Sequence, residues 1–232
     1  MGIPLRLRED TKSNYFSGER WLGYMSNPWK DISLSDYEKH MSLDSVKQLQ
    51  SMNRTMKKQF DDYDVSTVMI LGIAGGNGLE HIRKEKYQAV YGVDINETYL
   101  QAVIDRYKNL NGILKCINID ITKEADKLPE TELLIANLLI EYIGYEAFSD
   151  AVMRAKPRYV SCVIQINGAG KQWVSDSPYI HSFDGLDSIH HQMDECELTD
   201  IMKNIGYRLI KNSADTLPNG KILVRLDYQL SS

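Results

Sequence analysis

An apolar run, residues 68–71, leads directly into a loop that is rich in glycine. Residues 72–78 read GIAGGNG, with four glycines in seven positions, and an amphipathic segment follows. Glycine allows a sharp turn and a close approach of the backbone to a ligand, and the start of a following helix offers unpaired N–H groups. The order of apolar run, glycine loop and amphipathic segment therefore indicates a nucleotide-binding turn, rather than a turn that only packs a helix on a strand.

Two aspartates end the next apolar runs. Asp94 follows residues 89–93, 22 positions after Gly72, and Asp120 follows residues 113–119. A carboxylate accepts two hydrogen bonds at once, which suits a vicinal diol. Each aspartate also has an ordinary alternative. Asp94 can cap the amphipathic segment that starts near Glu97, and Asp120 can be a solvated loop residue.

The glycine spacing separates the nucleotide-binding classes. Neither Gly170-Lys171 nor Gly220-Lys221 completes a phosphate-binding GxxxxGK motif. The dinucleotide pattern GxGxxG fits in no frame, since counting from Gly72 puts Ala74 and Asn77 at its later glycine positions. The loop resembles instead the GxGxG loop of class I S-adenosylmethionine-dependent methyltransferases, with Gly72, Ala74 and Gly76 at its three small positions. This resemblance covers about residues 66–166.

The resemblance implies a cofactor, S-adenosylmethionine, and a product, S-adenosylhomocysteine. It implies that Asp94 holds the ribose hydroxyls, that Asp120 accepts from the adenine amino group, and that Ile121 lies against the ring. It places Asn137 and Leu138 beside the methionine part. The expected cofactor-binding residues are Gly72, Ala74, Gly75, Gly76, Asp94, Ile95, Asp120, Ile121, Asn137 and Leu138.

The chain departs from the family pattern at three places. Ile70 stands where the family usually has Asp or Glu, two residues before the first glycine, so another group must bind the amino group of the cofactor. Ala74 replaces the middle glycine. No Asn/Asp-Pro-Pro-Tyr/Phe motif follows residues 133–139, which weakens the case for methylation of base or amide nitrogens.

Candidate residues for the acceptor side follow the fourth apolar run. Glu141 and Tyr142 are the expected catalytic pair, and Glu141 can bind an amine or act as a base, or else be a carboxylate at a helix start. Residues 167–191 form a long connection that is expected to act as a lid. The N-terminal aromatic residues are expected to close the site. The substrate and lid candidates are Tyr24, Trp29, Tyr37, His40, Tyr179 and His181. No metal site is expected, because adjacent residues such as His190 and His191 point apart.

The elements that position these residues alternate along the chain. Apolar runs at 67–71, 89–93, 113–119, 133–139 and 159–166 alternate with helix-like segments at 79–86, 97–110, 145–155 and 195–205. Two further runs, 207–211 and 222–228, flank a turn at residues 218–220. The pattern predicts an α/β fold: a doubly wound, mostly parallel seven-stranded sheet with a closing antiparallel hairpin. Residues 66–232 are expected to form this Rossmann-like domain, and residues 1–65 an N-terminal helical cap with one helix from Ser42 to Phe60.

Composition and charge limit the kinds of binding partner that we expect. The 232 residues carry a net charge of −5, which argues against a nucleic-acid partner. The start, MGIPLRLRED, is not a signal peptide, and no run approaches the ~20 apolar residues of a membrane helix. Three scattered cysteines without a CxxC motif fit reduced thiols in a cytoplasmic protein. We expect a monomer or homodimer that methylates a small molecule.

Three alternatives stay open. The chain can be a methyltransferase that acts on RNA or protein, a nicotinamide-dependent oxidoreductase, or a non-catalytic protein that binds S-adenosylmethionine. The glycine spacing counts against the oxidoreductase. The long connection at 167–191 favours an enzyme, because a sensor needs no cover that excludes water.

Overall fold

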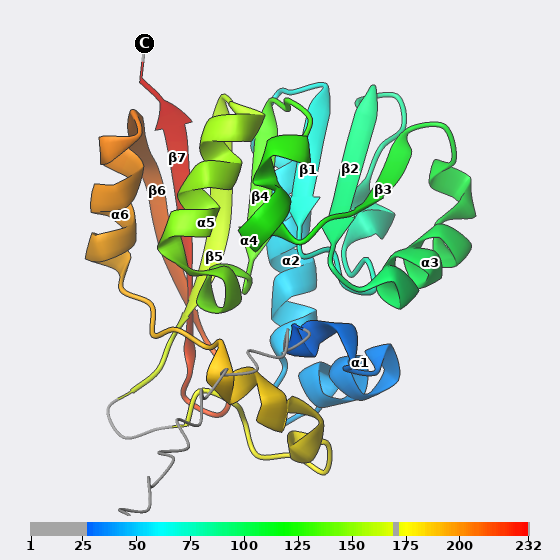
Figure 1. The fold of residues 1–232 in the computed structure, drawn as a ribbon, viewed down its shortest axis with the longest axis vertical. Coiled ribbons are helices and arrows are strands. Elements are labelled where there is room, and N and C mark those ends of the chain that lie inside the picture. Colours follow the sequence, from blue (N-terminus) through cyan, green and yellow to red (C-terminus); the bar gives the residue numbers. More distant parts are fainter. Residues whose placement is uncertain (1–26, 169–171, 232) are drawn as a thin grey trace, which may run out of the picture.

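A computed structural model describes residues 27–168 and 172–231 and contains one seven-stranded sheet. The strand order is β3-β2-β1-β4-β5-β7-β6, and every neighbouring pair is parallel except those of β7, which is antiparallel to β5 and β6 (Figure 1). The predicted doubly wound sheet with a closing hairpin is confirmed. The strands are β1 Thr67–Leu71, β2 Ala89–Asp94, β3 Leu114–Asn118, β4 Leu133–Asn137, β5 Tyr159–Ile166, β6 Tyr207–Thr216 and β7 Ile222–Leu230.

Helices cover both faces of the sheet, which explains why the central strands are apolar at consecutive positions. In β1, Met69 and Leu71 pack on one face, and Val68 and Ile70 pack on the other. The first face is covered by α4 (Ile121–Glu124), α5 (Ile140–Ala155) and α6 (Glu195–Asn204), and the second by α2 (Gln48–Asp61) and α3 (Glu97–Arg106). Side chains alternate along a strand, so a strand buried on both faces needs apolar residues throughout.

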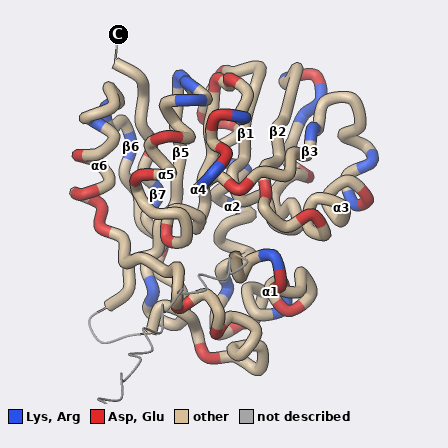
Figure 2. The backbone as a smooth tube through the Cα atoms, in the orientation of Figure 1, with Lys and Arg blue, Asp and Glu red and all other residues tan. Residues whose placement is uncertain are grey.

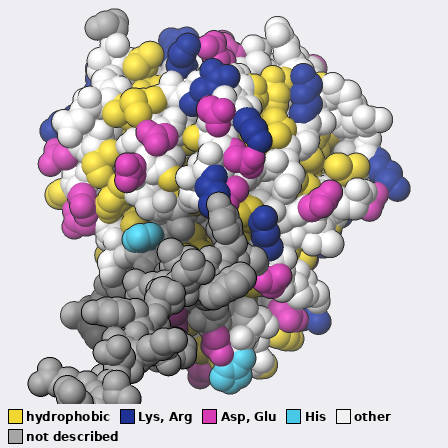
Figure 3. All heavy atoms as spheres, viewed as in Figure 1, with side chains coloured by type: hydrophobic (Ala, Val, Ile, Leu, Met, Phe, Trp, Pro, Cys, Tyr) yellow, Lys and Arg dark blue, Asp and Glu magenta, His cyan; other side chains and the backbone are white. Residues whose placement is uncertain are grey.

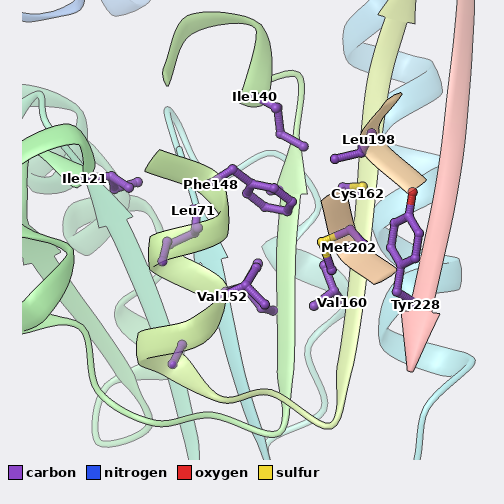
Figure 4. Close-up of a cluster of buried hydrophobic side chains, with 14 of the residues drawn as sticks. Leu71, Ile121, Ile140, Phe148, Val152, Val160, Cys162, Leu198, Met202 and Tyr228 are labelled. Carbon is purple, nitrogen blue, oxygen red and sulfur yellow. The ribbon is translucent and has the colours of Figure 1, made fainter. Parts of the chain in front are cut away.

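The larger core cluster joins α5 and α6 to the sheet. Phe148 of α5 and Met202 of α6 lie among residues of β5 and β7, including Cys162 and Tyr228 (Figure 4). Phe148 and Met202 are fully buried. Cys162 acts here as a small apolar side chain, and all three cysteines are free thiols.

Helix α1 (Leu34–Ser42) and a 3-10 helix, η5 (Ile180–Ser188), lie beyond the carboxyl ends of the parallel strands (Figure 1). Ligands of open α/β sheets bind at this edge. The two segments contact each other through a small apolar cluster that includes Tyr37 of α1 and Phe183 and Leu186 of η5. The remaining 3-10 helices are η1 Pro28–Lys30, η2 Leu79–His81, η3 Lys108–Leu110 and η4 Ala125–Lys127.

Several expected helices differ from the prediction. Residues 79–86 form only η2, because a single 3-10 turn already buries the two apolar residues of the segment, Leu79 and Ile82. The expected helix from Ser42 is two helices: Ser42 ends α1, and α2 starts after Lys47, whose φ is +53°. Helix α5 begins at Ile140, before the expected start, and is kinked at Gly144.

Helix α2 belongs to the packed core as well as to the N-terminal segment. Met56 and Phe60 share a cluster with Val68 and Ile70 of β1. The apolar stripe that predicts this helix is therefore buried against the sheet. The division of the chain at residue 65 stays a prediction.

Charges of both signs are interspersed along the chain (Figure 2). On the face that carries α4 and α5, Lys and Arg side chains lie beside Asp and Glu side chains (Figure 3). Of the helices in the two described ranges, none combines the length and apolar character needed to cross a membrane.

Candidate active site

The glycine loop holds its three small positions in the left-handed backbone region. The φ angles are +67° at Gly72, +46° at Ala74 and +79° at Gly76. This conformation explains the glycines, and it is unfavourable for an alanine. A hydrogen bond stabilises Ala74 in this conformation, because its N–H donates to Asp94 Oδ2 across 2.9 Å. The N–H groups of Gly72 and Ile73 both donate to the Val93 carbonyl, so the loop is joined to the end of β2.

Asp94 ends β2 and is 8% exposed. Its Oδ2 accepts from Ala74 N and its Oδ1 accepts from Asn96 N, each at 2.9 Å. Burial raises the pKa of this carboxyl. Asp94 does not cap α3, because Asn96 fills that role by accepting from the N–H groups of Thr98 and Tyr99. A carboxylate offers about four lone-pair positions, so both oxygens keep the capacity to accept from a ligand.

Asp94 faces a pocket of about 650 Å³ that opens to solvent, called here the first pocket. Most of the predicted cofactor-binding residues meet in it. Gly75 and Gly76 are absent from its lining, and Gly76 packs against Leu79 and Tyr107 instead. The lining consists of Gly72, Ala74, Asp94, Ile95, Asp120, Ile121, Asn137 and Leu138 together with Asn27, Trp29, Tyr37, Tyr99, Ile119, Leu139, Tyr142 and Ile143.

Asp120 is the cap of α4 rather than a solvated loop residue, and its contact with an adenine amino group stays a prediction. It lines the first pocket, and its Oδ1 also accepts from the N–H of Thr122 at the start of α4. Asn137 is held by Gln59 of α2: each side-chain amide donates to the other, at 2.8 and 2.9 Å. The amide of Asn137 is therefore fixed in the pocket wall.

A neighbouring pocket of about 580 Å³, called here the third pocket, lies on the glycine-loop side of the first pocket. It shares Gly72, Ala74 and Asn137 with the first pocket. Gly75 lines this pocket. Arg106 of α3 clamps α1 over the loop, because its guanidinium donates to both carboxylate oxygens of Glu38 and to the Gly75 carbonyl. The third pocket is lined by Tyr37, Glu38, Met41, Leu49, Met52, Met56, Ile70, Leu71, Gly72, Ile73, Ala74, Gly75, Asn77, Asn137 and Leu138.

The second pocket, of about 550 Å³, contains Glu141 and Tyr142 in its lining. It combines aromatic walls with several buried polar groups. Its lining is Trp29, Tyr37, His40, Met41, Gln48, Leu138, Glu141, Tyr142, Gln165, Trp173, Val174, Ser175, Phe183, His190 and Lys221.

Glu141 is buried in the first turn of α5, so its position at a helix start is also confirmed. One oxygen, Oε1, accepts from the backbone N–H of Gln165 at 2.7 Å. The other, Oε2, is buried and has no hydrogen-bond partner among the described residues. Burial raises the pKa of Glu141 to about 7. A carboxyl with this pKa and a vacant oxygen can exchange a proton near neutral pH.

Aromatic rings form the walls where the pockets meet. Trp29 contacts Tyr142 edge-on, with ring centroids 4.9 Å apart, and contacts Tyr37 in the same manner at 5.9 Å. Burial raises the pKa of both tyrosines. Tyr37 and Leu138 line all three pockets, so they mark the junction of the pockets. Leu138 is held with a φ of +55° directly after β4.

The other substrate candidates are distributed unevenly. His40 lines the second pocket, where its Nδ1 lies 2.7 Å from Ser177 Oγ, and burial lowers its pKa to about 4. Tyr179 and His181 line none of the three pockets. Phe183 and Leu186 are the residues of η5 that pack into the apolar cluster. The His181 side chain lies on the solvent side of η5, where it is 90% exposed beside Asp184. Tyr24 lies outside the described residues.

Sequence reasoning missed several polar groups of the second pocket. Gln48 donates to Gln165 at 2.6 Å, and Lys221 donates to the Trp173 carbonyl. Lys221 follows a hairpin turn, where a lysine normally faces solvent. No local pattern identifies these residues. In the described ranges, no group of three or more His, Cys, Asp or Glu side chains is placed to hold a metal ion.

No protein-family model matches the chain, and no curated protein matches its sequence. Solved structures match its fold. The N-methyltransferase NodS of Bradyrhizobium japonicum, in complex with S-adenosylhomocysteine, matches with a TM-score of 0.63 at 12% identity, over 89% of this chain and 100% of that one. The magnesium protoporphyrin IX methyltransferase of Synechocystis PCC 6803, also with bound S-adenosylhomocysteine, matches with a TM-score of 0.58 at 11% identity, over 84% and 87%.

A third match, the cyclase SpnF, has a TM-score of 0.60 at 8% identity, over 78% of this chain and 82% of that one. A fold that carries a cyclase does not by itself fix the reaction, which must be argued from the site. The strand order, the antiparallel β7 and these matches agree: the chain has the fold of the class I S-adenosylmethionine-dependent methyltransferases.

Proposed function

We propose that the protein transfers a methyl group from S-adenosylmethionine to a small-molecule acceptor. The main support is that the buried carboxylate of Asp94 and the glycine loop, with its left-handed backbone, line the first pocket. This pocket shares Tyr37 and Leu138 with the second pocket, which contains several polar groups. The first and third pockets suit the cofactor, and the second suits the acceptor.

The residues of the first and third pockets fit the parts of the cofactor. Asp94 keeps lone pairs for the ribose hydroxyls, and Asp120 lies beside Ile121 for an adenine ring. The family's carboxylate on the first strand is absent at Ile70, and Glu38 of α1 is the carboxylate that lines the third pocket. We assign Glu38 to the amino group of the methionine part.

When bound, the cofactor would supply an electrophilic methyl group: an acceptor atom bonds to the methyl carbon in line as the C–S bond breaks, and S-adenosylhomocysteine leaves as a neutral thioether. The chain itself aligns the acceptor and excludes water, and such alignment can contribute ~7 kcal/mol or more. Tyr37 and Tyr142 line both the first and the second pocket, and a cation is attracted to the face of an aromatic ring. We assign to Glu141, which lines the second pocket and has an unpaired Oε2 among the described residues, the proton that a hydroxyl or amine acceptor loses.

The second pocket also bears on the alternatives. A non-catalytic protein that binds S-adenosylmethionine has no need for a buried, partly vacant carboxyl beside the cofactor. The interspersed charges of Figures 2 and 3 offer no support for an RNA acceptor, whose backbone attracts clustered Lys and Arg.

Calorimetric titration tests the proposal. We expect S-adenosylmethionine and S-adenosylhomocysteine to bind the protein and NADH not to bind. Asp94→Ala should weaken cofactor binding by ~1.5–3 kcal/mol, the range for hydrogen bonds to a charged group. Asp150→Ala, at an exposed position of α5, is the matched control and should bind as wild type does. Binding of NADH alone, or unchanged affinity of Asp94→Ala, would overturn the proposal.

A further inference from the structure

Lys221 is a buried cation in the second pocket. The residue is 4% exposed, although it directly follows the turn between β6 and β7. Its backbone is fixed by that turn, since its N–H donates to Asn219 Oδ1 and its carbonyl accepts from Leu217 N. The ammonium donates to the Trp173 carbonyl. The hairpin therefore delivers a positive charge to the wall of the pocket.

Nothing among the described residues neutralises this charge. Burial is what perturbs the pKa of the Lys221 ammonium, with no contribution from a carboxylate of the described residues, and Glu141, which lines the same pocket, accepts from Gln165 N. Burial lowers the pKa of Lys221 to about 8, which still leaves it mostly charged at neutral pH. A buried cation without a counterion is unfavourable, and an anionic ligand would remove that penalty.

The other basic groups of the pocket add no second charge. Burial and the nearby Lys221 lower the pKa of His40 to about 4, and burial lowers that of His190 as well. Both imidazoles are therefore mainly neutral at pH 7, and the lining contains no arginine. One formal positive charge suits a monoanion better than a phosphate, which usually needs several donors or a guanidinium.

The walls around this charge are aromatic. Trp173 stacks on His190, with ring centroids 4.3 Å apart and an interplanar angle of 18°, and stands edge-on to Tyr142 at 6.1 Å. Phe183 packs on His40 at 4.7 Å. Aromatic rings favour offset-stacked or edge-to-face contacts with a further ring, so these walls suit an aromatic ligand.

We infer that the acceptor is a small aromatic carboxylate: Lys221 binds its carboxylate, the aromatic walls hold its ring, and Glu141 faces its hydroxyl or amino group. This inference rests on the proposed function. Its second support is that Glu141, which lines the same pocket, has a buried oxygen, Oε2, without a hydrogen-bond partner among the described residues.

Calorimetry with the protein saturated by S-adenosylhomocysteine tests the assignment. The probes are 4-hydroxybenzoate, its neutral relative 4-hydroxybenzamide, and 4-hydroxyphenyl phosphate. We expect 4-hydroxybenzoate to bind at least about tenfold more tightly than the other two, the effect of one charge-assisted hydrogen bond. Lys221→Met should abolish this preference and leave the affinity for 4-hydroxybenzamide within about twofold. Lys203→Met, which removes an exposed lysine of α6, should keep the preference.

Each other result overturns the inference. Equal binding of the carboxylate and the amide by wild-type protein, which needs no variant to fold, rules out recognition of charge. If 4-hydroxyphenyl phosphate binds more tightly than 4-hydroxybenzoate, the pocket does not select a monoanion. If Lys221→Met still prefers 4-hydroxybenzoate to 4-hydroxybenzamide, Lys221 is not the residue that binds the carboxylate. If S-adenosylhomocysteine binds and no probe does, only this inference fails. If S-adenosylhomocysteine itself does not bind, the proposed function fails too.

Discussion

Asp94 Oδ2 accepts a hydrogen bond from the N–H of Ala74 across 2.9 Å, which joins the end of β2 to the middle of the glycine loop. This bond holds an alanine in a backbone region that favours glycine, with φ at +46°. The same carboxylate thus shapes the loop and faces the pocket. A substitution at Asp94 should therefore affect both folding and binding.

Asp94→Asn separates charge from shape. The amide keeps one acceptor oxygen, but its NH₂ group must face the N–H of either Ala74 or Asn96. We expect a loss of about 1–3 kcal/mol in the free energy of unfolding, the usual effect of an unsatisfied buried donor. Urea denaturation measures this loss. Affinity for S-adenosylmethionine should fall as well, and a variant with wild-type stability and affinity would show that Asp94 does neither task.

Gly72→Ala tests whether the loop needs glycine for its backbone and for space. At φ +67°, a Cβ would meet Leu139 Cδ1 at 3.0 Å. The left-handed backbone alone should lower the free energy of unfolding by about 1–2 kcal/mol. Gly112→Ala is the matched control, because its φ is +96° and a Cβ there has no heavy atom within 4 Å. Both variants should lose stability in thermal unfolding, and only Gly72→Ala should also weaken binding of S-adenosylmethionine.

The glycine loop and Asp94 could be predicted because their signals are local. An apolar strand, a loop of small residues and an aspartate at the next strand end are read along the chain, and parallel strands must bring them to one edge. The same logic places Asp120 and Leu138 at the first pocket. The seven strands followed from the same alternation of apolar runs and amphipathic segments.

Lys221 and Gln48 could not be predicted, because long-range pairing positions them. Lys221 reaches the second pocket only because β7 pairs with β5 as well as with β6, which carries their shared turn to the carboxyl edge of the sheet. Gln48 reaches it through α2. His181 was selected for its chemistry, and the inward side of the 3-10 helix η5 is taken by Phe183 and Leu186. The spacing of residues along the chain indicates neither the pairing of distant strands nor which side of a 3-10 helix faces inward.

Glu141 should make stability depend on pH. Its pKa in the folded protein, about 7, lies above the ordinary value of 4.5. Between these values the unfolded chain releases the proton and the folded protein keeps it, so the free energy of unfolding falls as pH rises from about 4.5 to about 7. Glu141→Gln removes this slope, so its stability relative to wild type should rise by about 2–3 kcal/mol between pH 5 and pH 8. Chemical denaturation of both proteins at pH 5 and pH 8 measures the difference, and parallel pH curves would contradict it.

Glu141 should also control the rate. If it accepts the acceptor's proton, it must be ionised, so kcat/KM should rise with pH through about 7 and level off above. Glu141→Gln should lower kcat by about 100-fold or more. Methyl transfer to 4-hydroxybenzoate, followed by release of S-adenosylhomocysteine, gives this profile. A wild-type rate in Glu141→Gln would reduce Glu141 to a structural role.

The aromatic junction should favour the charged cofactor over its neutral product. Tyr37 lines all three pockets and packs edge-on against Trp29, so its ring stands where the sulfonium is proposed to lie. Attraction of a cation to a ring contributes about 0.5–2 kcal/mol, and S-adenosylhomocysteine lacks the charge. We therefore expect Tyr37→Leu to weaken binding of S-adenosylmethionine by about three- to tenfold while changing that of S-adenosylhomocysteine less. Tyr37→Phe keeps the ring and should retain the selectivity, so equal losses for both ligands in Tyr37→Leu would assign Tyr37 to packing alone.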